Sequence, residues 1–401
     1  MKIHIIGMQD TAPILSEKDR RIIANCKHFA GGKRHRELVD DILPTDAHWH
    51  NITVPLKALF DAITAAPELW CVFASGDPLF YGIAITLKKQ FPQADISVQP
   101  TFNSLQLLAH RLQLPYGEYH MVTLTGRPWQ AFDAALMDNK AKISLLTDRK
   151  KTPLTIAQRM LEAGYDNYIM HLGEKMGGKD ERVRSLSLDE ACTVDFQHPN
   201  CIFLEQTISK PLIKGIVESD FETLPGRPKM ITKMPIRLTT LALMHLHNHK
   251  VMWDVGACSG SISIETRLNY PHLDVVPFEI RPECDGIIRR NAKTFRVPGL
   301  VPIIGDFKAV DKDALACPDA VFLGGYGGDM RAVFEVIDHY LVVGGLVAFN
   351  AVSEKSINAF ESCVQAFNYS MIIKTVVGVD AHNPITIMTA EKQTFAHEFK
   401  K

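Results

Sequence analysis

The sequence predicts an α/β protein built from parallel sheets in more than one domain. Two observations support this prediction. Apolar runs of strand length alternate with amphipathic stretches of helix length through almost the whole chain, as expected for parallel strands joined by helices. The chain also has 401 residues, which is more than one hydrophobic core usually covers, so two or three domains are expected.

The first half of the chain begins this alternation at its first residues. Each expected helix carries apolar residues at three- and four-residue spacing, which gives it one apolar face. The expected strands cover residues 3–7, 70–76, 95–99, 120–126, 142–148, 167–173 and 201–206. The expected helices cover residues 16–26, 54–66, 78–90, 104–113 and 153–164.

A break in the pattern follows Glu205. The segment 210–235 contains four prolines and no sustained periodicity, so we expect a linker that leads into a second domain. The expected organisation is therefore a first domain over residues 1–208, a linker over 209–235 and a second domain over 236–395.

A second alternating series follows the linker. Its expected strands cover residues 250–256, 274–280, 301–306, 320–325, 345–351, 370–379 and 384–390. Helices separate the first six of these strands. Only the turn 380–383 separates the last two, which predicts an antiparallel hairpin at the end of the sheet.

Composition argues against several classes of function. The chain has 44 basic and 45 acidic side chains and lacks the basic excess typical of nucleic-acid binding. Its eight cysteines include no C-x-x-C pair, which argues against zinc and redox sites and favours a reducing, cytoplasmic location. No apolar run approaches the roughly 18 residues that cross a membrane, so no membrane partner is expected. No metal site is expected either, because the pairs His48/His50 and His245/His249 lack a carboxylate or cysteine partner.

The clearest chemical motif is WDVGACSGSISIE, residues 253–265, a loop between an expected strand and an expected helix. Gly256 and Gly260 stand four positions apart, without the third glycine of a dinucleotide fingerprint or the lysine of a Walker loop. The spacing suits a ligand without phosphates, such as S-adenosylmethionine. Cys258 stands where a glycine is often found, so its backbone is expected to keep φ below zero. The candidate cofactor contacts are Asp254, Gly256, Ala257, Gly260 and Ser261.

Two further strand ends favour the same ligand. Glu279 ends the next expected strand, where a carboxylate can accept hydrogen bonds from both ribose hydroxyls. Gly305 and Asp306 end the third strand, where a polar side chain can contact an adenine edge. Because parallel strands end at one rim of a sheet, these residues should meet at one ligand. The alternative is that the glycines only form turns, Glu279 is solvated and Asp306 caps a helix.

A second glycine motif, ASGDPLFYGIA, covers residues 74–84. Gly76 follows a strand, and Asp77 and Pro78 are well placed to cap and start the following helix. Capping alone would explain Asp77 and Pro78. It would not explain why Gly76 and Gly82 flank an aromatic pair.

The segment GDPLFYG resembles the signature of the tetrapyrrole methylases, which methylate uroporphyrinogen and corrin precursors. The second half resembles methylases that act at carbon 15 of the corrin ring and remove carbon dioxide from a ring acetate. The order of the two halves resembles the fused methyltransferases of cobalamin biosynthesis, over about residues 1–395. The other matching segments of the first half, in its carbon-5 branch, are GGKRH (31–35), LTGRP (124–128), LTD (146–148) with Thr152-Pro153, and GEKMGGKDERV (173–183). Those of the second half are ITKMPIR (231–237), WDVGACSGSISIE and DAVFLGGYGGD (319–329).

The resemblance implies a first domain of two α/β lobes with S-adenosylmethionine between them. It implies a second domain with a seven-stranded Rossmann-like sheet and a second S-adenosylmethionine. The family's first strand ends in a G-x-G turn, whereas this chain has Gly7 alone, which leaves the activity of the first domain open. The resemblance also implies a polycarboxylated tetrapyrrole substrate and a homo-oligomer. It places at the first cofactor Gly7, Gly76, Asp77, Pro78 and Ser104.

Basic side chains are expected near both cofactors because the implied substrate carries many carboxylates. The alternative is that the basic clusters are solvated helix ends and that the glycines after the fourth strand form a flexible turn. No catalytic acid or base is assigned, because methyl transfer to an electron-rich ring carbon depends mainly on alignment. The candidate substrate contacts are Lys33, Arg34, His35, Lys233, Arg237, Gly324, Gly325 and Tyr326.

The sequence therefore predicts an S-adenosylmethionine-dependent corrin methyltransferase with two active sites. One alternative is a single active methyltransferase joined to a degenerate tetrapyrrole-binding domain. A second is a tetrapyrrole carrier without enzymatic activity. A third, an NAD-dependent oxidoreductase, is disfavoured by the missing third glycine.

Overall fold

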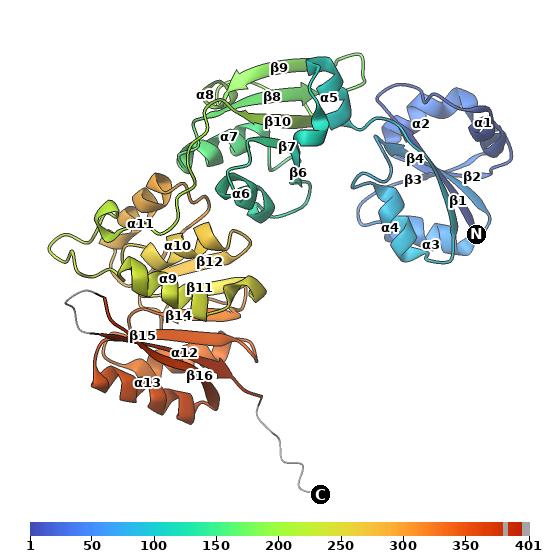
Figure 1. Ribbon diagram of the computed structural model, residues 1–401. Coiled ribbons are helices and arrows are strands. Elements are labelled where there is room, and N and C mark those ends of the chain that lie inside the picture. Colours follow the sequence, from blue (N-terminus) through green and yellow to red (C-terminus); the bar gives the residue numbers. More distant parts are fainter. Residues whose placement is uncertain (380–383, 395–401) are drawn as a thin grey trace, which may run out of the picture. The chain divides into compact units, whose positions relative to one another are not determined.

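The computed structural model describes residues 1–379 and 384–394 and divides into two compact units (Figure 1). The first unit comprises residues 1–127, 142–155 and 168–206. The second unit comprises residues 128–141 and 156–167 and the chain from Thr207 onward. The domain boundaries expected from the sequence, with a linker over 209–235, stay a prediction.

A parallel five-stranded sheet forms one part of the first unit. The central strands β1 (Lys2–Met8) and β4 (Leu69–Ser75) are buried over almost their whole length, because helices cover both faces of the sheet. Figure 1 shows α1 and α2 on one face and α3 and α4 on the other. The sheet order is β3-β2-β4-β1-β5. The other elements are α1 (Glu17–Ala24), β2 (His28–Gly31), α2 (Lys33–Val39), β3 (His48–Asn51), α3 (Lys57–Ala65), α4 (Ile83–Gln90) and β5 (Asp95–Gln99).

A second five-stranded sheet, of order β6-β7-β10-β8-β9, completes the first unit and is mainly antiparallel. Only β6 and β7 pair in parallel, whereas β10 runs against both of its neighbours. The expectation of parallel sheets is therefore wrong for this part. The loop 175–181 between β8 and β9 is too short for a crossover connection, so these strands form a hairpin. The elements are α5 (Ser104–Leu112), β6 (His120–Thr123), β7 (Lys142–Leu146), β8 (Tyr168–Glu174), β9 (Arg182–Ser187), α8 (Leu188–Ala191) and β10 (Asn200–Gln206).

The second unit contains a sheet of order β13-β12-β11-β14-β15-β17-β16 among its described residues. Its strands are parallel except β17, which runs against β15 and β16, so the predicted terminal hairpin is confirmed; its turn, 380–383, lies outside the described residues. Helices α9, α10 and α11 cover one face of the sheet, and α12 and α13 cover the other. The elements are α9 (Met234–Leu243), β11 (Val251–Val255), α10 (Ser261–Asn269), β12 (Asp274–Glu279), α11 (Glu283–Thr294), β13 (Ile303–Ile304), β14 (Ala320–Leu323), α12 (Met330–Tyr340), β15 (Leu346–Ala351), α13 (Glu354–Ala366), β16 (Tyr369–Val377) and β17 (Ile385–Lys392).

Strand β11 lies between β12 and β14, so the direction of the connections reverses on either side of it. Such a switch point opens a crevice at the carboxyl ends of the strands, where open α/β sheets bind their ligands. The motif of residues 253–265 starts on this strand and runs into α10. The fold thus places the predicted cofactor loop at the point of the sheet best suited to a ligand.

The second unit also contains α6 (Gln130–Met137) and most of α7 (Pro153–Glu162), which precede its main sheet in the chain. Asp133 is almost fully buried and accepts two hydrogen bonds from Arg159, at 2.7 and 2.6 Å. Arg267 on α10 lies 3.6 Å from the same carboxylate. This buried cluster of one acid and two bases ties α6 and α7 to α10 within the unit.

Several local predictions are wrong. The helix expected over 78–90 begins only at Ile83, with Gly82 at its N-cap. Asp77 instead accepts a hydrogen bond from the backbone N–H of Leu79 at 2.9 Å, so it stabilises a turn and caps no helix. Some elements were not predicted, because their short segments, such as HFAG and HWHN, lack a clear apolar period. These missed elements are β2, β3, β9, α2, α6 and α8.

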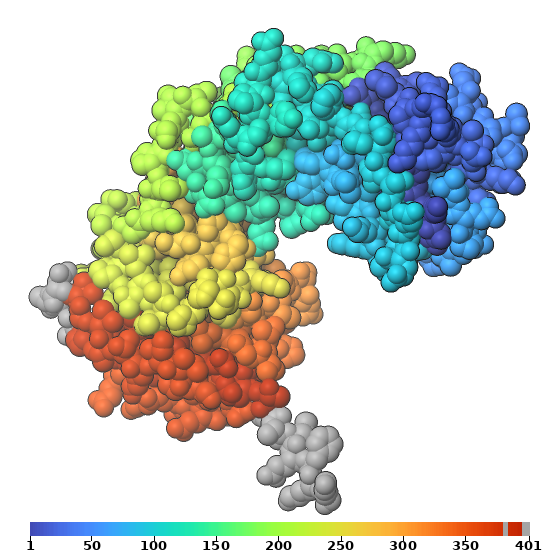
Figure 2. Space-filling model, turned by 45° about the vertical axis from the view of Figure 1, so that its right-hand side comes forward, coloured from blue at the N-terminus to red at the C-terminus, as the bar shows by residue number. Residues whose placement is uncertain are grey.

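A buried ion pair fixes the linker to the second unit. Arg237 and Glu265 are both fully buried, and two guanidinium nitrogens lie 3.1 and 3.2 Å from Oε2 of Glu265. Arg237 also donates to the carbonyl oxygens of Thr232, at 2.6 Å, and Ile216. Glu265 accepts from the N–H of Gly215 at 2.7 Å. Figure 2 shows the linker segment, in yellow-green, lying on the surface of this unit.

The prediction that Arg237 contacts the substrate is therefore wrong. Its guanidinium group is fully buried, lies over the ring of Phe221 and does not line the cavity at the strand ends of this unit. The sequence showed only that a basic residue precedes strand β11. It did not show that this residue lies on a helix, α9, with its side chain buried.

Two further features of the described residues bear on the classes of function considered above. None of the helices in this part of the chain combines the length and the apolar character that a membrane span requires. None of the eight cysteines, all of which lie in the described part of the chain, forms a disulfide bond, and five of them are buried.

We expect Arg237→Leu to lower the free energy of unfolding by about 3–5 kcal/mol, because it leaves the Glu265 carboxylate buried without its partner. Urea denaturation followed by circular dichroism would measure this loss. Arg290→Leu is the matched control, because it breaks the exposed pair with Glu222 and should lower the free energy of unfolding far less. Equal losses in the two variants would contradict a stabilising role for the buried pair.

Candidate functional site

A cavity of about 610 Å³ lies at the carboxyl ends of the strands in the second unit. It brings together the ends of β11, β12, β14 and β15, the turn after β13, and the last part of the linker. The meeting of strand ends expected from the sequence is thus confirmed by the fold. The predicted residues on its wall are Lys233, Asp254, Gly256, Ala257, Ser261, Glu279, Gly305, Asp306, Gly324, Gly325 and Tyr326.

The glycines of the β11 loop are required by close packing. Gly256 has φ of +85°, and a Cβ atom added there would lie 2.7 Å from the backbone nitrogen of Gly325. Its own N–H and that of Ala257 donate to the carbonyl of Phe278, at 2.9 and 3.0 Å. Gly260, with φ of +76°, is the N-cap residue of α10 and does not line the cavity. It shapes the loop, and its direct contact with the cofactor stays a prediction.

Cys258 contradicts the expectation of a negative φ. Its φ is +51°, in the left-handed region that favours glycine. The conformation aims the backbone N–H of Cys258 at Oε2 of Glu279, which accepts it at 2.8 Å. Burial, together with the nearby carboxylate of Glu279, raises the pKa of the Cys258 thiol. The thiol is therefore an unreactive wall of the cavity at neutral pH.

Glu279 is held at both carboxylate oxygens and is only 2% exposed. Oε2 accepts from Cys258, and Oε1 accepts from the N–H and the guanidinium group of Arg281, at 3.1 and 2.8 Å. The alternative of a solvated Glu279 is therefore wrong. Asp306 caps no helix either, because its carboxylate accepts from the N–H of Lys308 at 3.0 Å within a turn.

Buried polar atoms without a hydrogen-bond partner among the described residues lie on the cavity wall. Among them are Oδ1 of Asp254 and Oγ of Ser259. Such atoms are costly unless a ligand or water completes their hydrogen bonds. The wall is therefore suited to a ligand with several polar groups.

Asp254 has an unusual environment at the centre of this wall. Its other oxygen accepts from the N–H and hydroxyl of Ser263, at 3.1 and 2.6 Å. Burial raises the pKa of Asp254 to about 7, although the bonds from Ser263 oppose the shift. Asp254 thus changes its protonation state near neutral pH, unlike an exposed carboxylate.

The first unit contains a smaller cleft of about 180 Å³. It is lined by the residues after β1 and β4, by the start of α5 and by the loops that follow β8 and precede β10. Of the predicted residues it contains Gly76, Asp77, Ser104 and Arg34. Gly7 and Pro78 do not line it. A Cβ atom on Gly7 would lie 2.6 Å from the carbonyl oxygen of Gly76 and 2.8 Å from Pro78, so Gly7 allows the two loops to approach.

The predicted basic cluster of the first half contributes one side chain to this cleft. Arg34 lines it and pairs with Asp10, with 3.1 Å between Nε and Oδ1. Lys33 is exposed and lies outside it. Burial and the charge of Arg34 lower the pKa of His35 to about 4, so His35 is neutral at pH 7. Its Nδ1 accepts from Gly32 and its Nε2 lies 2.9 Å from Oγ of Ser75, so its predicted role as a substrate cation is wrong.

Several residues that line the larger cavity were not predicted from the sequence. Asn350 gave a usable signal, because it is a polar residue at the carboxyl end of an apolar strand. No sequence signal identified Phe307, Ile280 or the basic side chains, because their positions depend on which turns fold over the sheet. The missed lining residues include Lys229, Thr232, Ile280, Arg281, Phe307, Lys308, Asn350, Val352 and Ile385.

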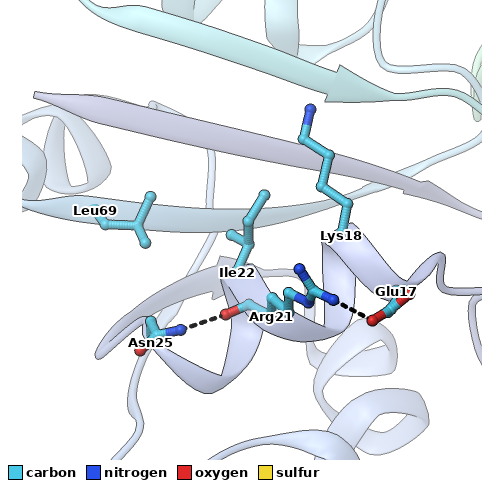
Figure 3. A pocket seen from close by; sticks show the side chains of 6 residues that line it. All are labelled: Glu17, Lys18, Arg21, Ile22, Asn25 and Leu69. Atoms are coloured by element: carbon cyan, nitrogen blue, oxygen red, sulfur yellow. Dashed lines mark hydrogen bonds and ion pairs between the residues drawn. The ribbon is translucent and has the colours of Figure 1, made fainter.

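A further hollow of about 510 Å³ lies beside α1 (Figure 3). Arg21 pairs there with Glu17, and the amide of Asn25 donates to the carbonyl oxygen of Arg21 at 2.7 Å. Lys18 extends away from these groups in the picture. No glycine loop and no predicted site residue contributes to this hollow. We therefore assign the chemistry to the two glycine-lined sites.

Two segments of the chain match the models of two known protein families. Residues 6–192 match the family of tetrapyrrole (corrin/porphyrin) methylases, and residues 226–390 match the precorrin methyltransferase domain. The chain is 31% identical to a precorrin-6Y C(5,15)-methyltransferase (decarboxylating) of Sinorhizobium over 357 residues, covering 87% of this chain and 84% of that protein. It is 29% identical to the protein of the same name from Mycobacterium tuberculosis over 348 residues, covering 85% of each.

A solved structure also resembles part of the chain. It is the crystal structure of a precorrin-6Y C5,15-methyltransferase from Geobacter metallireducens, with 31% sequence identity and a TM-score of 0.42. The match covers 45% of this chain and 98% of that one.

We expect Cys258→Gly to keep the free energy of unfolding within about 1 kcal/mol of the unaltered protein, because glycine adopts φ of +51° without strain. Cys258→Val should lower it by about 1–3 kcal/mol, since a β-branched residue is strained there. Thermal unfolding of the two variants checks this difference. A valine variant as stable as the glycine variant would argue against the left-handed conformation.

We expect the Asp254→Asn variant to be more stable than the unaltered protein. The difference in their free energies of unfolding should grow as pH rises from 5 to 8. The folded pKa of about 7 lies above the ordinary value of 3.8, so the folded state binds more protons between these values. Stability of the unaltered protein therefore falls as pH rises through this window and stays low above it. Thermal unfolding at pH 5, 6, 7 and 8 would measure the effect. A difference between the two proteins that is constant with pH would refute it.

Proposed function

The chain belongs to the family of precorrin-6Y C(5,15)-methyltransferases (decarboxylating), and from this premise we propose that it methylates a precorrin at carbons 5 and 15. The reaction at carbon 15 is accompanied by loss of carbon dioxide from a ring acetate. The observation that carries the proposal is the cavity of the second unit, whose wall joins the Gly256 loop, the held carboxylate of Glu279 and the glycine turn Gly324–Gly327.

S-adenosylmethionine, when bound, supplies a methyl group on a positively charged sulfur. The residues at β11, β12 and β13 fit its polar groups. The fixed carboxylate of Glu279 would accept hydrogen bonds from the ribose hydroxyls, while Ile280 and Phe307 would flank the adenine. Oδ1 of Asp254 and Oγ of Ser259, both buried without a partner, would meet the methionine end. Gly256 lets the backbone approach closely, since any side chain there would collide with Gly325.

The other end of the cavity fits a flat acceptor with carboxylates. Tyr326, Val352 and Ile385 make its wall apolar, which excludes water from the reacting carbon. Lys229 and Lys233, from the last part of the linker, add positive charge to the lining, which suits a substrate with many carboxylates. The residues of this chain thus bind and align the acceptor, and alignment supplies much of the rate enhancement.

We propose that the first unit carries the carbon-5 reaction with its own S-adenosylmethionine. Gly76, Asp77 and Ser104 meet in its cleft although the first loop has a single glycine. Arg34 and Lys175 are basic side chains of that cleft, and the pairing of Arg34 with Asp10 reduces the charge that Arg34 offers a substrate. The alternative, in which the first unit only binds tetrapyrrole, rests on the shorter loop. A cytoplasmic location, a homo-oligomeric state and the absence of a nucleic-acid partner remain predictions from the sequence.

We expect Gly76→Val and Gly256→Val each to remove one of two methyl transfers. Valine at Gly76, where φ is +63°, strains the first cleft, and valine at Gly256 collides with the turn after β14. Mass spectrometry of the product from labelled S-adenosylmethionine would count the methyl groups. Gly76→Val should abolish methylation at carbon 5, and Gly256→Val should abolish methylation at carbon 15 and decarboxylation.

Gly344→Val is the control for backbone strain, because Gly344 has φ of +77° and an added Cβ atom would meet nothing within 4 Å. This variant should retain both methylations. Loss of both transfers in each test variant would contradict two independent sites. Absence of any methyl incorporation by the unaltered protein would contradict the proposed function itself.

A further inference from the structure

The cleft of the first unit contains an acid where a substrate with many carboxylates is expected to bind. Asp10, on the segment 9–16 between β1 and α1, lines this cleft together with Arg34 and Lys175. A carboxylate on the wall repels a substrate of the same charge. The place of Asp10 therefore needs an explanation other than direct substrate binding.

Two basic side chains among the described residues line this cleft, and each is paired with an acid of the protein. Nε of Arg34 lies 3.1 Å from Oδ1 of Asp10, and Nζ of Lys175 lies 3.4 Å from Oδ2 of Asp180. Asp180 does not line the cleft, whereas Asp10 does. The carboxylate of Asp10 thus occupies the position beside Arg34 that a substrate carboxylate would take.

Arg34 has a second anchor that does not depend on Asp10. Its Nη2 donates a hydrogen bond to Oγ of Ser75 at 3.1 Å, at the end of β4. A guanidinium group has five N–H donors in a fixed fork, so one nitrogen can stay on Ser75 while others bind a carboxylate. One carboxylate can therefore replace another at Arg34 without displacing the arginine.

The segment that carries Asp10 packs closely on the loop between β8 and β9. A Cβ atom added at Gly178 would lie 2.9 Å from Cβ of Asp10, and one added at Gly177 would lie 2.9 Å from Cβ of Gln9. The two glycines of the motif GEKMGGKDERV thus leave room for this segment. With the segment in place the cleft measures about 180 Å³, below the roughly 300 Å³ at which sites for small molecules begin. The segment must move before a cofactor and a tetrapyrrole can bind together.

The contacts of the segment favour such a movement. The side chains of Asp10 and Arg34 are 26% and 40% exposed, and exposed pairs of this kind contribute little to stability. Ile14, near the middle of the segment, is 95% exposed and so adds little packing. A ligand carboxylate can therefore replace that of Asp10 at small cost.

We propose that Asp10 holds the place of a substrate carboxylate at Arg34, and that the substrate enters the first unit by exchanging its own carboxylate for that of Asp10. This inference rests on the proposed function of the first unit. The exchange releases the segment 9–16 from Arg34 and enlarges the cleft, and no covalent bond changes. Asp10 is thus a specificity-determining residue, because only an acceptor with a carboxylate in reach of Arg34 opens the cleft.

The test compares Asp10→Asn, Arg34→Gln and the double variant in the full chain. The KM for precorrin in carbon-5 methylation, followed by mass spectrometry, should fall about two- to fivefold in Asp10→Asn, because the substrate no longer displaces a charged competitor. The KM should rise in Arg34→Gln. In the double variant it should equal that of Arg34→Gln, because Asp10 acts through Arg34.

The double variant separates exchange from general repulsion. If Asp10→Asn lowers the KM equally with and without Arg34, Asp10 only repels the substrate and the proposal is overturned. An unchanged or raised KM in Asp10→Asn would overturn it as well.

The same chain offers two controls. The KM of carbon-15 methylation, assigned to the second unit, should stay constant in all these variants. Asp40→Asn is the matched surface control, because it breaks the exposed pair of Asp40 with Arg36, at 2.8 Å on the same helix as Arg34. It should change neither KM, and an effect equal to that of Asp10→Asn would overturn the proposal.

A cross-link tests the movement of the segment. The 2.9 Å between Cβ of Asp10 and a Cβ atom at Gly178 is within about 1 Å of the separation in a disulfide, so Asp10→Cys with Gly178→Cys can form one. Oxidation of this variant should stop carbon-5 methylation and spare carbon-15 methylation, and reduction should restore the first. Carbon-5 methylation by the cross-linked chain would overturn the proposal.

A binding measurement separates this inference from the proposed function. If the unaltered protein adds only the carbon-15 methyl group, the proposed reaction of the first unit fails. The exchange is then tested on a unit that only binds tetrapyrrole, by binding of precorrin-6Y followed by its visible absorption. Asp10→Asn should tighten this binding, and the double variant should match Arg34→Gln. Any other order of affinities would overturn the exchange.

Discussion

The buried ion pair between Arg237 and Glu265 holds the wall on which the site of the second unit depends. Arg237 donates a hydrogen bond to the carbonyl of Thr232, and Glu265 accepts one from the backbone N–H of Gly215. The pair therefore anchors the linker at two positions. Residues 229–233 of that linker line the cavity. A buried pair with several hydrogen bonds is costly to break and therefore favours one arrangement. The arginine expected to bind substrate instead positions the neighbours that line the cavity.

The order of strands then separates two chemical tasks along one cavity. The ends of β11 and β12 present polar groups held by the protein, namely Asp254 and Glu279. The ends of β15 and β17 present a mostly apolar wall with one amide, that of Asn350. Because parallel strands end at one rim, a donor and an acceptor bound side by side would meet near β14. The first unit has a smaller cleft, and its two sheets differ in topology.

The sequence predicted well wherever a feature depends on a few neighbouring residues. It located the β11 loop, the helix that follows this loop and the antiparallel pair β16–β17. It failed where a distant partner decides the conformation. Cys258 adopts a left-handed conformation, and in this conformation its N–H donates a hydrogen bond to Glu279. The negative φ expected from the sequence would point this N–H elsewhere. Burial makes His35 neutral, although it stands in a basic run.

By itself the sequence determined which segments form the main strands, and therefore which residues reach the rim of the second unit's sheet. Local periodicity and glycine spacing are sufficient for that, because they act over one strand or one turn. Only the tertiary structure decided which of those residues face a ligand. Burial, the partners of each carboxylate and the tie between Asn350 and Thr240 depend on elements about 20–110 residues apart, and these meet only when the sheet is packed.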